Sequence, residues 1–129
     1  MRIFKTAWFN RFARKNDIKD EALVALINDL EAGIFDADLG GGVFKKRLAR
    51  EGEGKSGGYR TLICFRQNER AFFVFGFSKS AMGNISQREL ADLKKLADTI
   101  LTIEWEEIDE GIAKGKFFEV GVNDENVQE

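Results

Sequence analysis

The sequence contains no histidine, and this absence excludes more chemistry than any other feature of its composition. Without histidine there are no Ser-His or Cys-His nucleophile pairs, and the commonest metal ligand of proteins is missing. Cys64 is the single cysteine, so an internal disulfide is excluded and a zinc site would need a cage of carboxylates. We therefore expect no metal and no cofactor, and any acid–base chemistry must use Lys, Arg, Tyr, Asp or Glu.

Proline is also absent, and no Gly-, Ser- or Gln-rich run is long enough to be a flexible linker. The chain has 129 residues, of which 43% are hydrophobic, and twelve are Phe, which is enough for one packed core. We predict a single domain over residues 1–129. Cys64 stands inside the apolar run Leu62–Phe65 and is expected to be an ordinary core residue.

Long hydrophobic runs are missing as well. No apolar stretch approaches the roughly 20 residues that span a bilayer. The opening segment Met1–Lys5 carries charge too early for an export signal. These features predict a cytoplasmic protein without a membrane partner.

The net charge of −2 conceals an uneven distribution of charged residues. Between Val43 and Lys79, nine Lys and Arg stand against three acidic residues, a balance of +6. Between Glu104 and Glu129, nine acidic residues stand against two Lys, a balance of −7. This asymmetry predicts a basic surface for a polyanion and an acidic segment from about residue 104. The alternative is a solvated surface on which like charges cluster by accident.

Hydrophobic periodicity and turn residues predict an α+β domain built on one antiparallel sheet, with helices mainly on one face. The expected order is β-α-α-β-β-β-α, followed by a further helix and strand. The expected strands are Arg2–Thr6, Val43–Leu48, Tyr59–Arg66, Ala71–Phe77 and Lys116–Val122. Two N-terminal helices are expected, over Trp8–Asn16 and from an Asp17 cap to Gly33; later helices are expected from a Ser86–Glu89 capping box and over Glu104–Ala113. The glycines at 40–42 predict a break, and 51–58 a loop.

Side chains alternate between the two faces of a strand, and this rule brings cations together. Lys45 and Arg47 share one face of their strand, and Arg60 and Arg66 share one face of the next. We expect Lys45, Arg47 and Arg60 to converge near one edge of the sheet, together with Lys79 if its strand runs on. Phosphate is the natural ligand of such a group. The alternative is that the cations from 45 to 47 are the solvent face of an edge strand.

Neighbouring residues predict contacts with RNA around these cations. Lys55, in the glycine-rich loop, would fold over a bound phosphate, and Tyr59 would stack on an unpaired base. The alternative for Tyr59 is packing against the core. Lys46 and Arg66 complete the expected RNA-binding set.

Three ordered motifs resemble a known family. They are GGGVFKKR at 40–47, GKSGGYR at 54–60, and FGFSKS at 75–80 with Asn84-Ile85-Ser86. These segments resemble RelE/HigB-like toxins of type II toxin–antitoxin modules, and the likeness runs over nearly the whole chain. The chain departs from the family in its acidic net charge and in lacking the C-terminal Tyr of the best-studied branch.

The resemblance implies a RelE-like fold and a toxin that cleaves mRNA in the ribosomal A site. It also implies a cognate antitoxin, expected to be of helix-turn-helix type. Carried over by position, the catalytic candidates are Lys45, Arg47, Arg60 and Lys79. The implied reaction is attack by the RNA 2′-hydroxyl on its adjacent phosphate, with one Lys as base and Arg residues stabilising the phosphate charge.

Two other functions are compatible with the same fold. One is a ParE-like toxin that binds DNA gyrase, and the other is an inactive toxin-fold protein that acts only in an antitoxin complex. The acidic segment also has two interpretations. It is either an ordinary solvated helix and tail, which we expect, or a competitor of RNA for the basic sheet.

Overall fold

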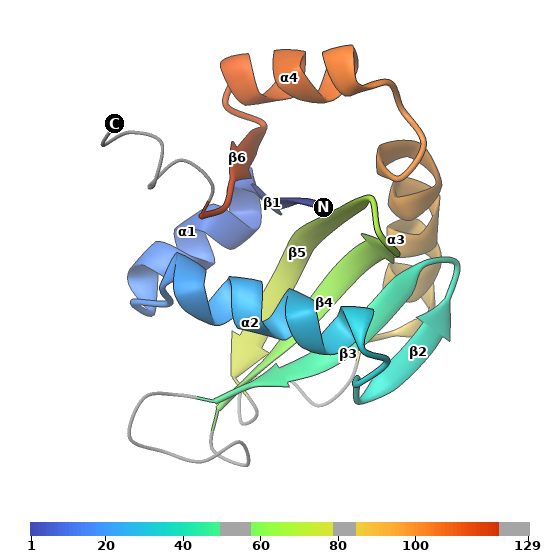
Figure 1. Cartoon of the computed structure of the whole chain (residues 1–129). Helices are drawn as coiled ribbons and strands as arrows, with labels where there is room; N and C mark the ends of the chain where they lie inside the picture. The colour runs from blue at the N-terminus through green and yellow to red at the C-terminus, as the bar shows by residue number, and fades with distance from the viewer. Residues whose placement is uncertain (50–57, 79–84, 122–129) are drawn as a thin grey trace.

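The computed structural model describes residues 1–49, 58–78 and 85–121, and Figure 1 shows how they are arranged. The strands are β1 (Arg2–Thr6), β2 (Ala37–Gly40), β3 (Val43–Leu48), β4 (Tyr59–Arg66), β5 (Arg70–Ser78) and β6 (Phe117–Glu119). The helices are α1 (Ala7–Lys15), α2 (Asp20–Glu31), α3 (Gln87–Ile100) and α4 (Trp105–Ala113). The predicted α+β class is confirmed.

All the strands form one sheet in the order β2-β3-β4-β5-β1-β6. Every pair of neighbours is antiparallel except β1 and β5, which run parallel. β4 and β5 form the predicted hairpin, whose turn includes Asn68 in the left-handed region at φ 64°. β1 lies between β5 and β6, so the first and last strands of the described structure are neighbours.

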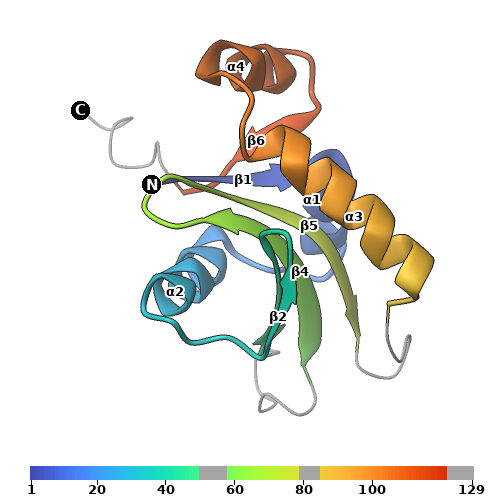
Figure 2. The ribbon, with the colours of Figure 1, turned by 90° about the vertical axis from the view of Figure 1, so that its right-hand side faces the viewer.

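Helices cover both faces of the sheet, so the expectation of helices mainly on one face is wrong. Figure 2 shows α2 and α3 on opposite sides of β4 and β5. Ile63 and Phe65 of β4 belong to the core cluster under α1 and α2. Leu62 and Cys64 belong to the cluster under α3 and α4. The continuous apolar run in β4 is the cause, because a strand that is hydrophobic on both sides must be covered on both sides.

Two local predictions differ from the structure. The glycines after residue 39 do not simply break the chain, because Ala37–Gly40 pairs with β3 as an additional strand. Asp17 does not cap α2: it stands in a turn at φ 56°, and the helix begins at Asp20 after Lys19.

The predicted capping box of α3 is confirmed. The Ser86 hydroxyl accepts a hydrogen bond from the Glu89 backbone N–H at 3.0 Å. In return, the Glu89 carboxylate accepts one from the Ser86 backbone N–H at 2.9 Å. Two N–H groups that lack helical partners are thereby satisfied.

Cys64 is fully buried, as predicted, and burial raises the pKa of its thiol to about 12. Across the described ranges, no helix is long and apolar enough to cross a membrane.

Candidate functional site

Three of the predicted cations lie together on the α3 face of the sheet. Arg47 of β3 is the direct cross-strand partner of Arg60 in β4, and Lys45 is the partner of Leu62. Directly opposed residues of antiparallel strands have Cα atoms about 4.5–5.5 Å apart. All three cations share the face of Leu62, which belongs to the core cluster under α3. We call Lys45, Arg47 and Arg60 the cation triad.

Arg60 is the member of the triad whose guanidinium has an unsatisfied hydrogen-bond donor within the described structure. Its side chain is half-buried, and its Nη1 atom is buried without a hydrogen-bond partner in the described parts of the chain. Buried polar groups normally have partners, because removing them from water without one costs free energy. The neighbouring Arg47 cannot supply one, since a guanidinium only donates. An anion bound here would satisfy the group.

Arg47 and Lys45 are held differently. The Arg47 guanidinium pairs with Asp36, with Nε and Oδ1 3.2 Å apart, and its backbone N–H also donates to that carboxylate. Asp36, the residue immediately before β2, positions Arg47, and β2 is the strand that the sequence failed to predict. Lys45 is half-buried and makes no ion pair with any residue the structure describes.

An apolar pocket of about 200 Å³ lies beside the triad on the same face. Phe77 lines it and is the cross-strand partner of Arg60. The other lining residues are Trp8, Leu62, Phe75, Gly76, Ile85 and Glu89. Sequence reasoning missed this pocket, because the helical spacing of Trp8, Phe9 and Phe12 predicts a helix without showing which of the three rings stays exposed. In the structure Phe9 is fully buried and Trp8 is 40% exposed.

Two residues of the expected RNA-binding set lie on the opposite face. Lys46 is 4% exposed, and its ammonium group lies 3.3 Å from the carboxylate of Asp29 in α2. Tyr59 is also buried, and its hydroxyl donates to Asn16 Oδ1 at 3.3 Å. Neither side chain is presented to a ligand at the triad, because alternation along β3 and β4 turns both toward α1 and α2. For Tyr59, packing is the correct interpretation.

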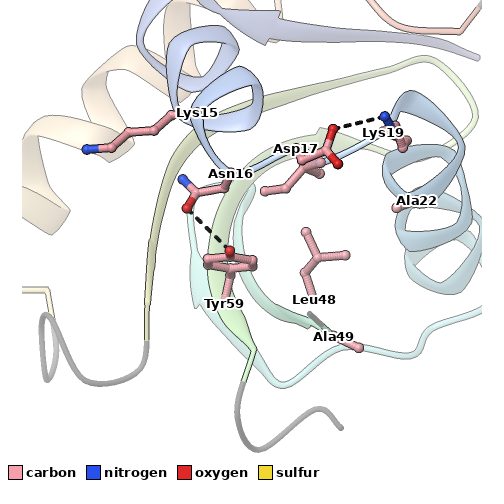
Figure 3. Close-up of a pocket in the computed structure, with 9 residues that line it drawn as sticks. Lys15, Asn16, Asp17, Lys19, Ala22, Leu48, Ala49 and Tyr59 are labelled. Atoms are coloured by element: carbon pink, nitrogen blue, oxygen red, sulfur yellow. Dashed lines mark hydrogen bonds and ion pairs between the residues drawn. The ribbon is translucent and has the colours of Figure 1, made fainter. Parts of the chain in front are cut away.

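A larger cavity of about 500 Å³ opens on this opposite face, where Tyr59 and Asn16 meet. Figure 3 shows that Lys15 extends away from it and that Lys19 is engaged by Asp17, with Nζ and Oδ1 2.9 Å apart. The remaining lining residues are Ile18, Ala22, Leu48 and Ala49. The cavity gathers no group of unpaired cations from the described residues, so it is a weaker candidate for an anion than the triad.

The remaining predicted residues are not part of the triad. Arg66 lies six residues along β4 from Arg60, about 20 Å at the usual rise of a strand. Its guanidinium donates to the Leu101 carbonyl at 3.0 Å and lies 3.5 Å from the Glu69 carboxylate. Lys55 and Lys79 lie outside the described residues. Within the described ranges, no group of three or more His, Cys, Asp or Glu is placed to hold a metal ion.

Comparison with protein families matches residues 1–120 to the family described as RelE toxin of the RelE/RelB toxin–antitoxin system. No curated protein sequence matches the chain.

Proposed function

Since this chain belongs to the RelE family of toxins of toxin–antitoxin systems, we propose that it is a ribosome-dependent endoribonuclease that cleaves mRNA. Toxins of this family generally cleave mRNA. The single observation that carries the proposal is the cation triad, with a buried Arg60 Nη1 that has no protein partner in the described structure. Convergent cations favour catalysis on a phosphodiester over binding of a protein such as gyrase, because they match the charge that develops on phosphate.

In the proposed reaction, the RNA 2′-oxygen attacks the adjacent phosphorus and the bond to the 5′-oxygen breaks. The products are a 2′,3′-cyclic phosphate and a free 5′-hydroxyl. Lys45, acting as a neutral amine, accepts the proton of the 2′-hydroxyl, and Arg60 donates hydrogen bonds to the phosphate oxygens as negative charge grows on them. Arg47, held by Asp36, adds a second planar donor.

The proton for the leaving 5′-oxygen is not assigned to an aromatic side chain. Tyr59 is the sole tyrosine of the chain, and it lies on the other face of the sheet. Water bound at the site supplies that proton in our scheme, and the hydroxide so formed takes back the proton that Lys45 accepted. The ribosome, which we propose as the second partner, orders the mRNA so that the phosphate and the 2′-hydroxyl are aligned.

Family membership implies an antitoxin as partner. We propose an antitoxin of helix-turn-helix type and, because the proposed substrate is mRNA under translation, a cytoplasmic site of action. Lys55, between Arg47 and Arg60 in sequence, and Lys79, directly after β5, remain proposed contributors.

The test is induced expression in a bacterial host with primer extension on a reporter mRNA. Wild type is expected to arrest growth and to give in-frame cuts that disappear when translation of the reporter is blocked. Arg60→Ala is expected to lower cutting about 100- to 1,000-fold, as does the loss of one preorganised donor in other enzymes. Arg66→Ala removes another Arg side chain from the same strand, about 20 Å from Arg60. This variant is expected to cut like wild type.

Each outcome has a distinct meaning. Arrest without cuts would replace the proposal with a gyrase-binding or other binding toxin. Equal loss of cutting in both Arg variants would mean that cutting depends on the overall positive charge of the protein and not on the triad. No arrest and no cutting by wild type would leave a toxin fold that acts only in an antitoxin complex.

A further inference from the structure

The apolar pocket beside the triad exposes aromatic surface that the fold itself does not use. Trp8 is 40% exposed and Phe75 is 36% exposed, and both line this pocket. Exposed aromatic side chains that line one pocket commonly mark a binding site. The other large hydrophobic residues of comparable exposure, among them Phe118 of β6, do not line it.

Trp8 is held rigidly at the rim of the pocket. Its ring stacks on Phe12 at 5.6 Å between centroids and 16° between planes. The edge contact with Phe75 has a centroid distance of 4.8 Å. Thr6 fixes the first turn of α1 against β5, because its hydroxyl donates to the Val74 carbonyl at 3.2 Å and accepts from the Phe9 backbone N–H. A preorganised ring loses little conformational entropy when a second ring stacks on it.

The charged residues around the pocket favour the phosphate of a nucleotide at one place and its base at another. On one side, Arg60 is the cross-strand partner of Phe77, which lines the pocket. Its buried Nη1 has no hydrogen-bond partner among the described residues, and an anion would supply one. At the rim stands Glu89, the acidic member of the capping box of α3, whose pKa is lowered by hydrogen bonds from Ser86. A carboxylate there repels phosphate and accepts hydrogen bonds from N–H groups. A phosphate is therefore favoured at Arg60 and a neutral, flat, N–H-bearing ring in the pocket.

We propose that this pocket, with Trp8 as its stacking platform, binds one unpaired nucleobase of the RNA next to the phosphate held by Arg60. The inference deepens the proposed endoribonuclease function and rests on it. The volume of about 200 Å³ suits a single base, since pockets for drug-sized ligands are roughly 300–1,000 Å³. Trp8 is a positioning residue that sets which phosphate reaches the triad.

The test uses the full chain and a short, fluorescein-labelled, 2′-O-methyl RNA, which cannot be cleaved because its 2′-oxygen carries a methyl group. A second probe has the same backbone without bases. Binding of both probes is measured by fluorescence anisotropy for wild type, Trp8→Leu, Trp8→Phe and Phe118→Leu. Phe118→Leu is the matched control, because it removes an exposed aromatic ring from β6, away from the pocket.

Trp8→Leu is expected to weaken binding of the base-containing probe by about 5- to 150-fold, the range for loss of one base–aromatic stack. It should change binding of the abasic probe by less than about twofold, since phosphate contacts carry that affinity. Trp8→Phe should recover most of the lost affinity, and Phe118→Leu should match wild type. Tryptophan fluorescence should fall on RNA binding in wild type and stay constant in Trp8→Leu.

Three results would overturn the inference. They are equal affinities of Trp8→Leu and wild type for the base-containing probe, equal losses on both probes, and no binding of either probe by wild type. The first would assign the aromatic surface to a protein partner, and the second would reduce Trp8 to a structural role. The reporter assay tests the underlying function separately. If wild type cuts reporter mRNA and Trp8→Leu cuts it at the same position and with the same efficiency, only the pocket proposal fails.

Discussion

At the scale of single residues, Lys45 and Lys46 show how one step along a strand changes what a lysine does. Lys45 faces α3 and makes no ion pair with the described residues, whereas Lys46 faces α2 and pairs with Asp29. The Lys46 side chain is only 5% exposed, while that of Asp29 is 45% exposed. Lys46 thus stabilises the packing of α2 on β3, and Lys45 is the lysine that lies in the triad.

We expect Lys46→Ala to lower the free energy of unfolding by about 1–2 kcal/mol and to leave RNA affinity unchanged. The loss combines a buried aliphatic stem with an ion pair whose carboxylate regains water, which keeps the effect below that of breaking a fully buried pair. Urea denaturation and RNA anisotropy measure the two quantities. A matched Lys45→Ala variant should show the reverse pattern, and weaker RNA binding by Lys46→Ala would contradict this assignment.

The sequence predicted the triad because alternation and β-strand length are local properties. Lys45, Arg47 and Arg60 follow from counting along two strands. The same count places Lys46 and Tyr59 on the other face. They were predicted to bind RNA only because they stand within the sequence motifs. The Arg47–Asp36 pair could not be predicted, nor could the lack of a partner for Arg60 Nη1 among the described residues, because both depend on how β2, β3 and β4 are arranged in three dimensions.

At the scale of elements, the capping box fixes where α3 begins and so where the rim of the pocket stands. This signal is local in sequence, and it was predicted from Ser86 and Glu89 alone. β2 gave no comparable signal, because four residues ending in glycine have little strand propensity of their own. Its pairing with β3 supplies the hydrogen bonds that hold it in place.

The capping box makes a pH-dependent contribution to stability. Hydrogen bonds from the Ser86 backbone N–H and hydroxyl lower the pKa of Glu89 below its ordinary value of 4.5. A depressed carboxyl pKa adds stability above the unfolded pKa, and this is lost as pH falls through the folded pKa. We therefore expect Glu89→Ala to be less stable than wild type near neutral pH, with the difference shrinking below about pH 4.5.

Thermal unfolding of wild type and Glu89→Ala between about pH 7 and pH 3 checks this expectation, because the range brackets the ordinary carboxyl pKa. Asp92→Ala serves as the control, since Asp92 is an exposed acid in the next turn of α3 and takes no part in the capping box. A difference between wild type and Glu89→Ala that stays constant over the whole range would show that Glu89 acts by packing and not by its charge.

At the scale of the whole molecule, α4 of the acidic segment and the cation triad lie at different ends of the sheet. Figures 1 and 2 both place α4 at the end of the molecule opposite the start of β4, where the triad begins. Arg2 of β1 lies 3.1 Å from Asp109 of α4 and 2.9 Å from Glu119 of β6. The carboxylates of Glu119 and Asp109 raise the pKa of Arg2, and Arg2 is their ion-pair partner. We therefore expect that the described part of the acidic segment does not compete with RNA for the triad.

The net charge of −2 consequently says little about RNA binding, and the salt dependence of affinity should report only the local charge. For single strands, each neutralised phosphate contributes about −0.7 to the slope of log affinity against log salt concentration. If each of the three triad cations neutralises one phosphate, the slope is expected near −2, and Arg60→Ala should reduce its magnitude by about 0.7. Replacing Glu106 and Glu107 of α4 by Gln should leave both slope and affinity unchanged, because these carboxylates lie away from the triad. An affinity gain in that double variant would instead show that the acidic segment and RNA compete for the same surface.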